Sequence, residues 1–218
     1  MPVNCLLYYI TDRTVFSGDE PSRRRRLLEK IREAAGAGVD YIQLREKDLS
    51  PRELESLARE AVGVIRETSP LRTALLINSR TDVALAVQAN GVHLRSHDIN
   101  QQDARAMWKC GAGAPARELS PRDPVIGVSC HLPTEVANAA ANAATFAVFA
   151  PVFEKKEARA SGLNLLKEAC RANIPVLALG GITLANAHSC LAAGAAGLAA
   201  IRLFQQNDIA AVVKQLRG

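Results

Sequence analysis

The chain has 218 residues, of which 48% are hydrophobic and 4% aromatic, and its formal net charge is +5. This length suits one substantial core, so residues 1–218 are expected to form a single domain. The scarcity of aromatic residues argues against a nucleic-acid platform, and five cysteines without a Cys-x-x-Cys pair argue against a disulfide framework or a zinc site.

The cysteine content and the short apolar runs favour a soluble, cytoplasmic protein with no membrane partner, and the positive charge does not indicate a nucleic-acid partner. Much of the positive charge sits in residues 23–26, four consecutive arginines in the first turns of an expected amphipathic helix, where they would form a solvated face. No apolar run reaches membrane-spanning length, and the apolar N-terminus at 1–10 lacks a basic leader.

Short apolar segments alternate with helical patterns along the whole chain. Strands are expected near 5–10, 39–44, 74–78, 91–94, 125–129, 146–150, 176–179 and 197–201, and helices near 21–37, 51–67, 81–88, 101–110, 133–143, 164–172, 184–193 and 208–216. The strands are almost continuously apolar, as in a parallel sheet covered on both faces. Eight such strand-helix units predict an α/β protein with a single (β/α)8 TIM barrel, with an open doubly wound sheet as the alternative.

Function in such a barrel gathers on the loops that follow the strands. After the second strand, Gln43, Arg45 and Lys47 occupy every second position, which on a strand would place them on one face. An Arg fork and a Lys point charge suit a phosphate or diphosphate group. The alternative is an edge strand with solvated charges.

A second phosphate site is expected after the seventh strand. Gly180 and Gly181 precede a helix, so backbone N–H groups there could reach a phosphate. Arg202, after the eighth strand, either adds positive charge to that site or pairs with a surface acid. Phosphate sites in barrels often occur after these two strands.

Two histidines and one aspartate complete the candidate residues. His93 lies within an apolar strand and is more typical of a hydrogen-bonded core residue than of a catalyst, whereas His131 follows a strand end beside Ser129 and could exchange protons with a ligand. Asp98 is the carboxylate best placed for a hard cation such as Mg²⁺, although one carboxylate makes a poor site.

Seven motifs in order resemble the thiamin phosphate synthase and TenI family of (β/α)8 barrels. They are YITD at 9–12, QLREK at 43–47, LIN-x-R-x-DVA at 76–84, GVHL at 91–94, IGVS-x-H at 126–131, PVF at 151–153 and ALGGI at 178–182. The resemblance implies an enzyme that joins hydroxymethylpyrimidine diphosphate to hydroxyethylthiazole phosphate and releases diphosphate with Mg²⁺ assistance.

Carried over residue by residue, the resemblance implies two substrate sites on one barrel. The pyrimidine diphosphate would be held by Gln43, Arg45, Lys47 and Asn78, with Asp98 on Mg²⁺ and with His93 and Ser129 lining the pyrimidine site; Gly181 would bind the thiazole phosphate. Arg45 and Lys47 would act in catalysis, because cations stabilise the negative charge that develops on departing diphosphate.

Three departures from the family pattern keep alternatives open. Ser79 stands where the synthases carry a second metal-binding Asp, residues 154–158 with Lys155 and Lys156 replace a phosphate-binding loop, and Arg202 replaces a small Ser. Thiazole tautomerases of the same family also lack that Asp and use a His at the position of His131 as the base. A barrel that binds a phosphorylated metabolite without catalysis is the third alternative, and either a monomer or a homodimer is compatible with the sequence.

Overall fold

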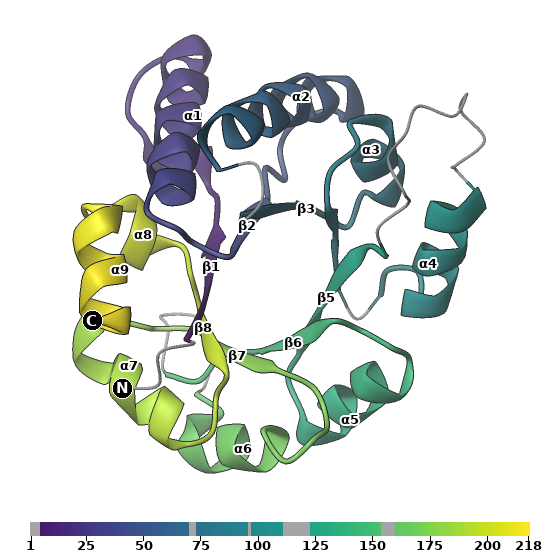
Figure 1. Ribbon diagram of the computed structural model, residues 1–218, viewed down its shortest axis with the longest axis vertical. Coiled ribbons are helices and arrows are strands. Elements are labelled where there is room, and N and C mark those ends of the chain that lie inside the picture. Colours follow the sequence, from purple (N-terminus) through teal and green to yellow (C-terminus); the bar gives the residue numbers. More distant parts are fainter. Residues whose placement is uncertain (1–4, 70–72, 96, 111–122, 154–159) are drawn as a thin grey trace.

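The computed structural model describes residues 5–69, 73–95, 97–110, 123–153 and 160–218. Within them, parallel strands close into a barrel in chain order, each paired with its neighbours and β1 with β8 (Figure 1). The strands are β1 (Leu6–Ile10), β2 (Tyr41–Leu44), β3 (Ala74–Asn78), β4 (Gly91–Leu94), β5 (Val125–Cys130), β6 (Phe146–Phe149), β7 (Val176–Leu179) and β8 (Gly197–Ala200). The expected (β/α)8 barrel is confirmed, and the open sheet is excluded.

The helices form a ring outside the barrel (Figure 1). They are α1 (Glu20–Gly36), α2 (Pro51–Thr68), α3 (Thr81–Ala86), α4 (Gln101–Cys110), α5 (Pro133–Ala141), α6 (Gly162–Ala169), α7 (Leu184–Ala192) and α9 (Ile209–Arg217). Two short helices were not expected from the sequence: the 3-10 helix η1 (Arg13–Val15) after β1, and α8 (Arg202–Gln205) after β8. Arg202 therefore begins a helical turn and does not end a strand.

Local chemistry explains where the helices begin. The Ser50 side chain accepts from the backbone N–H of Glu53, whose carboxylate returns to the Ser50 N–H at 2.9 Å, and Pro51 stands at the first helical position. Such a box satisfies N–H groups that the helix itself leaves without partners. The capping fixes the start of α2 directly after the loop that carries Arg45 and Lys47.

Alternation along the strands separates two apolar clusters. Tyr8, Leu76, Phe146 and Leu177 belong to a cluster inside the barrel, whereas Tyr9 packs in the larger cluster between strands and helices. This double coverage is the reason that the strands read as nearly continuous apolar runs. Among the described residues, no helix combines the length and the apolar character needed to cross a bilayer.

Candidate active site

A chain of hydrogen bonds crosses the barrel interior below the ends of β1, β2, β4 and β5. The Gln43 amide nitrogen donates to the Tyr8 hydroxyl at 2.8 Å, this hydroxyl lies 3.2 Å from His93 Nδ1, and His93 Nε2 lies 2.8 Å from the Ser129 hydroxyl. Gln43 and His93 are 1% and 3% exposed. The structure thus unites three predicted site residues, with Gln43 and His93 beneath the rim of the barrel.

The direction of this chain follows from the charge state of His93. Burial, with the nearby Arg45 charge adding to it and Asp98 opposing it, lowers the pKa of His93 to about 3, so the imidazole is neutral and carries one N–H. Because Gln43 donates to the Tyr8 oxygen, the Tyr8 proton is directed at His93 Nδ1. Nε2 then carries the imidazole proton and donates to Ser129, whose own hydroxyl proton is available to a ligand.

Arg45 is positioned by a buried carboxylate beside it. Glu46, whose pKa is raised by burial, accepts from the Thr11 hydroxyl at 2.5 Å and from the Arg13 backbone N–H at 2.9 Å. The same Thr11 oxygen accepts from the Arg45 backbone N–H at 3.0 Å. Arg13 also pairs with Asp48 at 2.7 Å, so its charge is used to hold the loops after β1 and β2 together.

Positive charge accumulates above these residues. Arg45 lowers the pKa of Lys47, with desolvation and the Arg95 charge adding to the effect. Burial lowers the pKa of Arg45, and Asp12 and Glu46 oppose that change while Arg95 adds to it. In the described part of the chain, neither Arg45 nor Lys47 has a carboxylate within 4.0 Å. Cations that repel one another and have no ion-pair partner form a site for an anion.

The expected strand geometry of this segment holds only in part. β2 ends at Leu44, so Gln43 is the only one of the three alternating residues that lies on the strand itself. Arg45 and Lys47 follow in the loop, where Arg45 is half-buried and Lys47 is exposed, and the Arg45 charge lowers the pKa of Lys47. The reading as a plain solvated edge strand is wrong, because β2 is paired on both sides.

Asp98 does not offer a suitable site for Mg²⁺. One carboxylate oxygen accepts from the Arg95 backbone N–H at 2.7 Å, and the other lies 3.2 Å from the Arg95 guanidinium. Burial raises the pKa of Asp98, but the hydrogen bonds from Arg95 and from the Ser79 hydroxyl outweigh it and leave the pKa below its ordinary value. Across the described residues, no group of three or more His, Cys, Asp or Glu side chains could hold a metal ion. Mg²⁺ requires near-ideal octahedral oxygen ligation, and a guanidinium directed at the same oxygens opposes it.

Ser79 lies where the family pattern has a second metal-binding Asp, and it directly follows Asn78, which was expected to hold the diphosphate. The Asn78 amide donates to the Ser79 hydroxyl at 3.2 Å, and Asn78 pairs with His93 in the register of β3 and β4. Ser79 has a φ of 61°, so the chain turns sharply there away from the strand. The turn presents a hydroxyl at this position, and a hydroxyl is a weaker Mg²⁺ ligand than a carboxylate.

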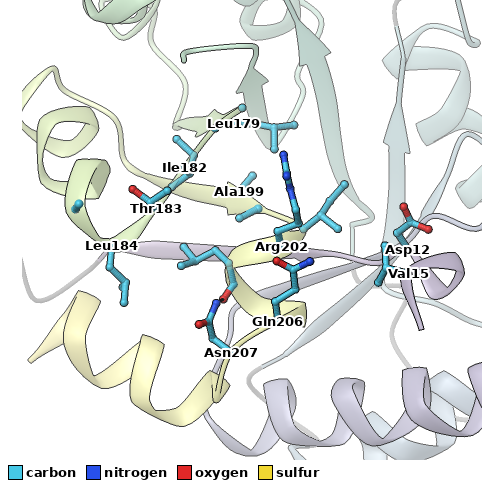
Figure 2. Close-up of a pocket in the computed structure, with 16 residues that line it drawn as sticks. Asp12, Val15, Leu179, Ile182, Thr183, Leu184, Ala199, Arg202, Gln206 and Asn207 are labelled. Carbon is cyan, nitrogen blue, oxygen red and sulfur yellow. Dashed lines mark hydrogen bonds between the residues drawn. The ribbon is translucent and has the colours of Figure 1, made fainter. Parts of the chain in front are cut away.

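The loop after β7 borders a cavity of about 790 Å³. Gly180 and Gly181 have φ values of +106° and +64°, a region that glycine enters without steric cost. A Cβ on Gly180 would stand 2.7 Å from Pro151 Cα. Figure 2 shows the Arg202 side chain extending from the start of α8 toward Leu179 in this cavity. In the described part of the chain, Arg202 has no ion pair, so the predicted surface pairing is not formed.

His131 lies at the rim between β5 and β6. Its Nδ1 is 2.6 Å from the Ala150 carbonyl, and its backbone N–H donates to the Glu135 carboxylate at 2.5 Å. A carbonyl only accepts, so Nδ1 carries the proton and the neutral ring keeps its lone pair on Nε2. That tautomer can accept a proton. Lys155 and Lys156, expected to replace a phosphate loop, lie outside the described residues.

Two residues of this site were not selected from the sequence. Tyr8 sits in an apolar run, and its inward alternation on β1 was the available signal. Arg95 was not selected either, and its spacing of three residues before Asp98 was the available signal for their pairing. Both contribute contacts that link predicted residues to one another.

Comparisons with known proteins identify the family to which the chain belongs. The family described as thiamine monophosphate synthase matches residues 7–204. The chain is 41% identical over 204 residues to a putative thiamine-phosphate synthase of Geobacter sulfurreducens, covering 91% of this chain and 86% of the relative. It is 35% identical to the thiamine-phosphate synthase of Clostridium novyi, covering 95% and 94%.

A solved structure extends the agreement to three dimensions. The thiamine phosphate pyrophosphorylase of Pyrococcus furiosus superposes with a TM-score of 0.77 at 30% identity, over 99% of this chain and 95% of that one. The match spans all the strands whose ends form the candidate site. By sequence and by fold, the chain belongs to the thiamine monophosphate synthase family.

Proposed function

We propose that the chain, acting as one barrel domain over residues 1–218, is a thiamin phosphate synthase, a transferase of thiamin biosynthesis. It couples hydroxymethylpyrimidine diphosphate with hydroxyethylthiazole phosphate to give thiamin phosphate and diphosphate. One observation supports the proposal: the cations after β2, which have no ion-pair partner among the described residues, share the barrel rim with a glycine loop and Arg202 at a separate cavity. Two phosphorylated substrates require two such sites.

The diphosphate site performs the bond-breaking step. The C–O bond between the pyrimidine methylene and the diphosphate breaks, and its electron pair leaves with the diphosphate. Arg45 and Lys47 stabilise that charge where it develops, and Asn78, the last residue of β3, orients the group. The lone pair of the thiazole nitrogen then forms the new C–N bond to the methylene carbon.

The interior hydrogen bonds orient the pyrimidine. Gln43 and His93 lie below the ligand, and His93 holds the Ser129 hydroxyl so that its proton points to an acceptor on the ring. At the other site, backbone N–H groups of Gly180 and Gly181 and the Arg202 guanidinium bind the thiazole phosphate. Both substrates are small polar metabolites, so the proposal places the reaction in the cytoplasm.

Product formation tests this function directly. The purified protein is incubated with both phosphorylated precursors, and thiamin phosphate is measured by mass spectrometry. We expect product, and we expect Lys47→Met to reduce the rate at least about tenfold through loss of one charge-assisted contact. Arg59→Ala, a change on the surface of α2 where Arg59 pairs with Glu55, serves as the matched control. Absence of product at saturating substrates would exclude the proposal.

The second candidate is a thiazole tautomerase, favoured by the anchored tautomer of His131. With Nδ1 held by the Ala150 carbonyl, Nε2 is placed to remove the proton whose transfer aromatises a thiazole phosphate. This function predicts conversion of the thiazole tautomer by the protein alone and its loss in His131→Ala. Unchanged conversion in that variant would exclude His131 as the base.

A barrel that binds a phosphorylated metabolite without catalysis predicts a third outcome. Thiazole phosphate would then raise the melting temperature, because a ligand that binds only the native state stabilises it, while neither reaction occurs. The Arg202 cavity is where such a ligand would bind. A thermal shift accompanied by turnover would exclude this alternative.

A further inference from the structure

The Arg95–Asp98 pair occupies the place where the family pattern led us to expect a metal ion. Arg95 engages both oxygens of Asp98, through its backbone N–H at 2.7 Å and its guanidinium at 3.2 Å. The Asp98 side chain is 11% exposed, whereas that of Arg95 is 55% exposed. The carboxylate is thus enclosed by its own loop, and the cation remains accessible to a ligand.

The pair also lacks the partners that a metal would need. Ser79 presents a hydroxyl to Asp98, and no group of three or more acidic, His or Cys side chains gathers in the described parts of the chain. A dication bound by Asp98 would have to displace a guanidinium whose hydrogen bonds already satisfy the carboxylate. The groups around Asp98 therefore suit an ion pair with the Arg95 guanidinium better than they suit the binding of Mg²⁺.

The position of Arg95 relative to the other cations completes the argument. Its charge acts on both Arg45 and Lys47, although the residues come from the loops after β4 and β2. Glu46 and Thr11 fix the backbone of Arg45, and Asp98 fixes Arg95. Two guanidinium groups, of which that of Arg95 is held by Asp98, and one ammonium group thus follow the ends of β2 and β4 at the same rim of the barrel, and this set of cations suits an anion with several oxygens.

We propose that Arg95 takes the charge-neutralising place of a divalent cation, so that Arg45, Lys47 and Arg95 bind the diphosphate group directly and without metal. Asp98 is then a positioning residue for Arg95. The inference rests on the proposed function for the identity of the ligand, but the binding of inorganic diphosphate tests it separately from product formation.

The experiment measures the affinity of inorganic diphosphate for the full chain by calorimetry, once in EDTA and once with excess Mg²⁺. We expect binding in EDTA, with Mg²⁺ strengthening it by less than about tenfold. We expect Arg95→Ala to weaken binding in EDTA at least about tenfold. Arg95→Lys keeps the charge but loses the planar fork, so its affinity for diphosphate should lie between those of the wild type and Arg95→Ala. Arg59→Ala is the control, because Arg59 is similarly exposed at 57% and pairs with the Glu55 carboxylate on its own helix, α2.

Each outcome decides one claim. Binding that requires Mg²⁺, absence of binding in both media, or equal affinity in Arg95→Ala and the wild type would overturn the inference. Product formation that occurs only with Mg²⁺ would also overturn it and leave the synthase function standing. If diphosphate binds in EDTA but no thiamin phosphate forms with EDTA or with Mg²⁺, the inference about Arg95 is supported and the synthase function is rejected.

Discussion

The Tyr8 hydroxyl lies 3.2 Å from Nδ1 of His93, and both side chains are buried inside the barrel. The contact joins β1 to β4 across the interior, where the register of adjacent strands provides no link. Through this contact Tyr8, which lies in an apolar run of β1, helps His93 to orient the Ser129 hydroxyl.

Tyr8→Phe should lower the free energy of unfolding by about 2 kcal/mol, because it leaves the Gln43 amide and His93 Nδ1 without their partner inside the barrel. Urea denaturation measures the change. Tyr9→Phe is the matched control: the Tyr9 hydroxyl is buried and has no hydrogen-bond partner among the described residues, so its removal should not lower the free energy of unfolding and should raise it by about 1 kcal/mol. Equal effects of the two substitutions would refute the role of Tyr8.

Stability should fall as the pH is lowered from 6.5, because of His93. Burial lowers its pKa to about 3, so below 6.5 the unfolded chain takes up a proton that the folded chain does not. The contribution is fully present above pH 6.5 and is lost as the pH falls toward the folded pKa. Between pH 6.5 and 5 the free energy of unfolding should decrease by about 2 kcal/mol.

The control for this pH dependence is His93→Gln, which keeps a donor and an acceptor but does not titrate. Urea denaturation at pH 7, 6 and 5 compares the two proteins. The exposed histidines His97, His131 and His188 are common to both and cancel in the difference. Parallel curves for the wild type and the variant would show that His93 is not the group responsible.

Arg45→Gln should separate function from stability. The substitution removes a half-buried cation that Arg95 repels, so the free energy of unfolding should stay the same or increase. The same change removes a charge-assisted contact to the diphosphate, so kcat/KM should fall at least about tenfold. Kinetics and denaturation on the same preparation test both parts, and a clear loss of stability would contradict the assignment.

Gly180→Ala should destabilise the protein by about 2 kcal/mol or more. A φ of +106° is unfavourable for any residue with a Cβ, and the added atom would meet Pro151 at 2.7 Å. Gly63→Ala on α2 is the control, since nothing lies within 4 Å of its Cβ and alanine is the better helix former by up to about 1 kcal/mol. Equal denaturation midpoints for the two variants would exclude strain at Gly180.

The barrel could be predicted because each unit carries its own local signals. The strands at 74–78, 91–94 and 176–179 were expected with the bounds that the structure shows, since apolar runs there are bounded by turn residues. Helix α8 was missed because its four residues are too few to show a helical period. Its first residue is Arg202, so this small error moved a site residue from a strand end to a helical turn.

The site was predicted less completely than the fold. Arg45 and Lys47 were expected from charge and spacing, and both lie at the rim. The bond from Gln43 to Tyr8 and the pairing of Arg95 with Asp98 depend on how loops and strands meet in space, which periodicity does not encode. Sequence patterns therefore identified the residue types of the site but not the partners that orient them.

The burial of the tyrosines also provides an intrinsic optical reporter. The chain contains three tyrosines, and burial raises the pKa of Tyr8, Tyr9 and Tyr41 alike. At a pH of about 11, above the ordinary tyrosine pKa of about 10, phenolate absorbance should therefore stay low while the barrel is closed and rise when it opens. Rapid-mixing pH jumps followed in the ultraviolet would then record the rate at which the barrel opens, without any label attached to the protein.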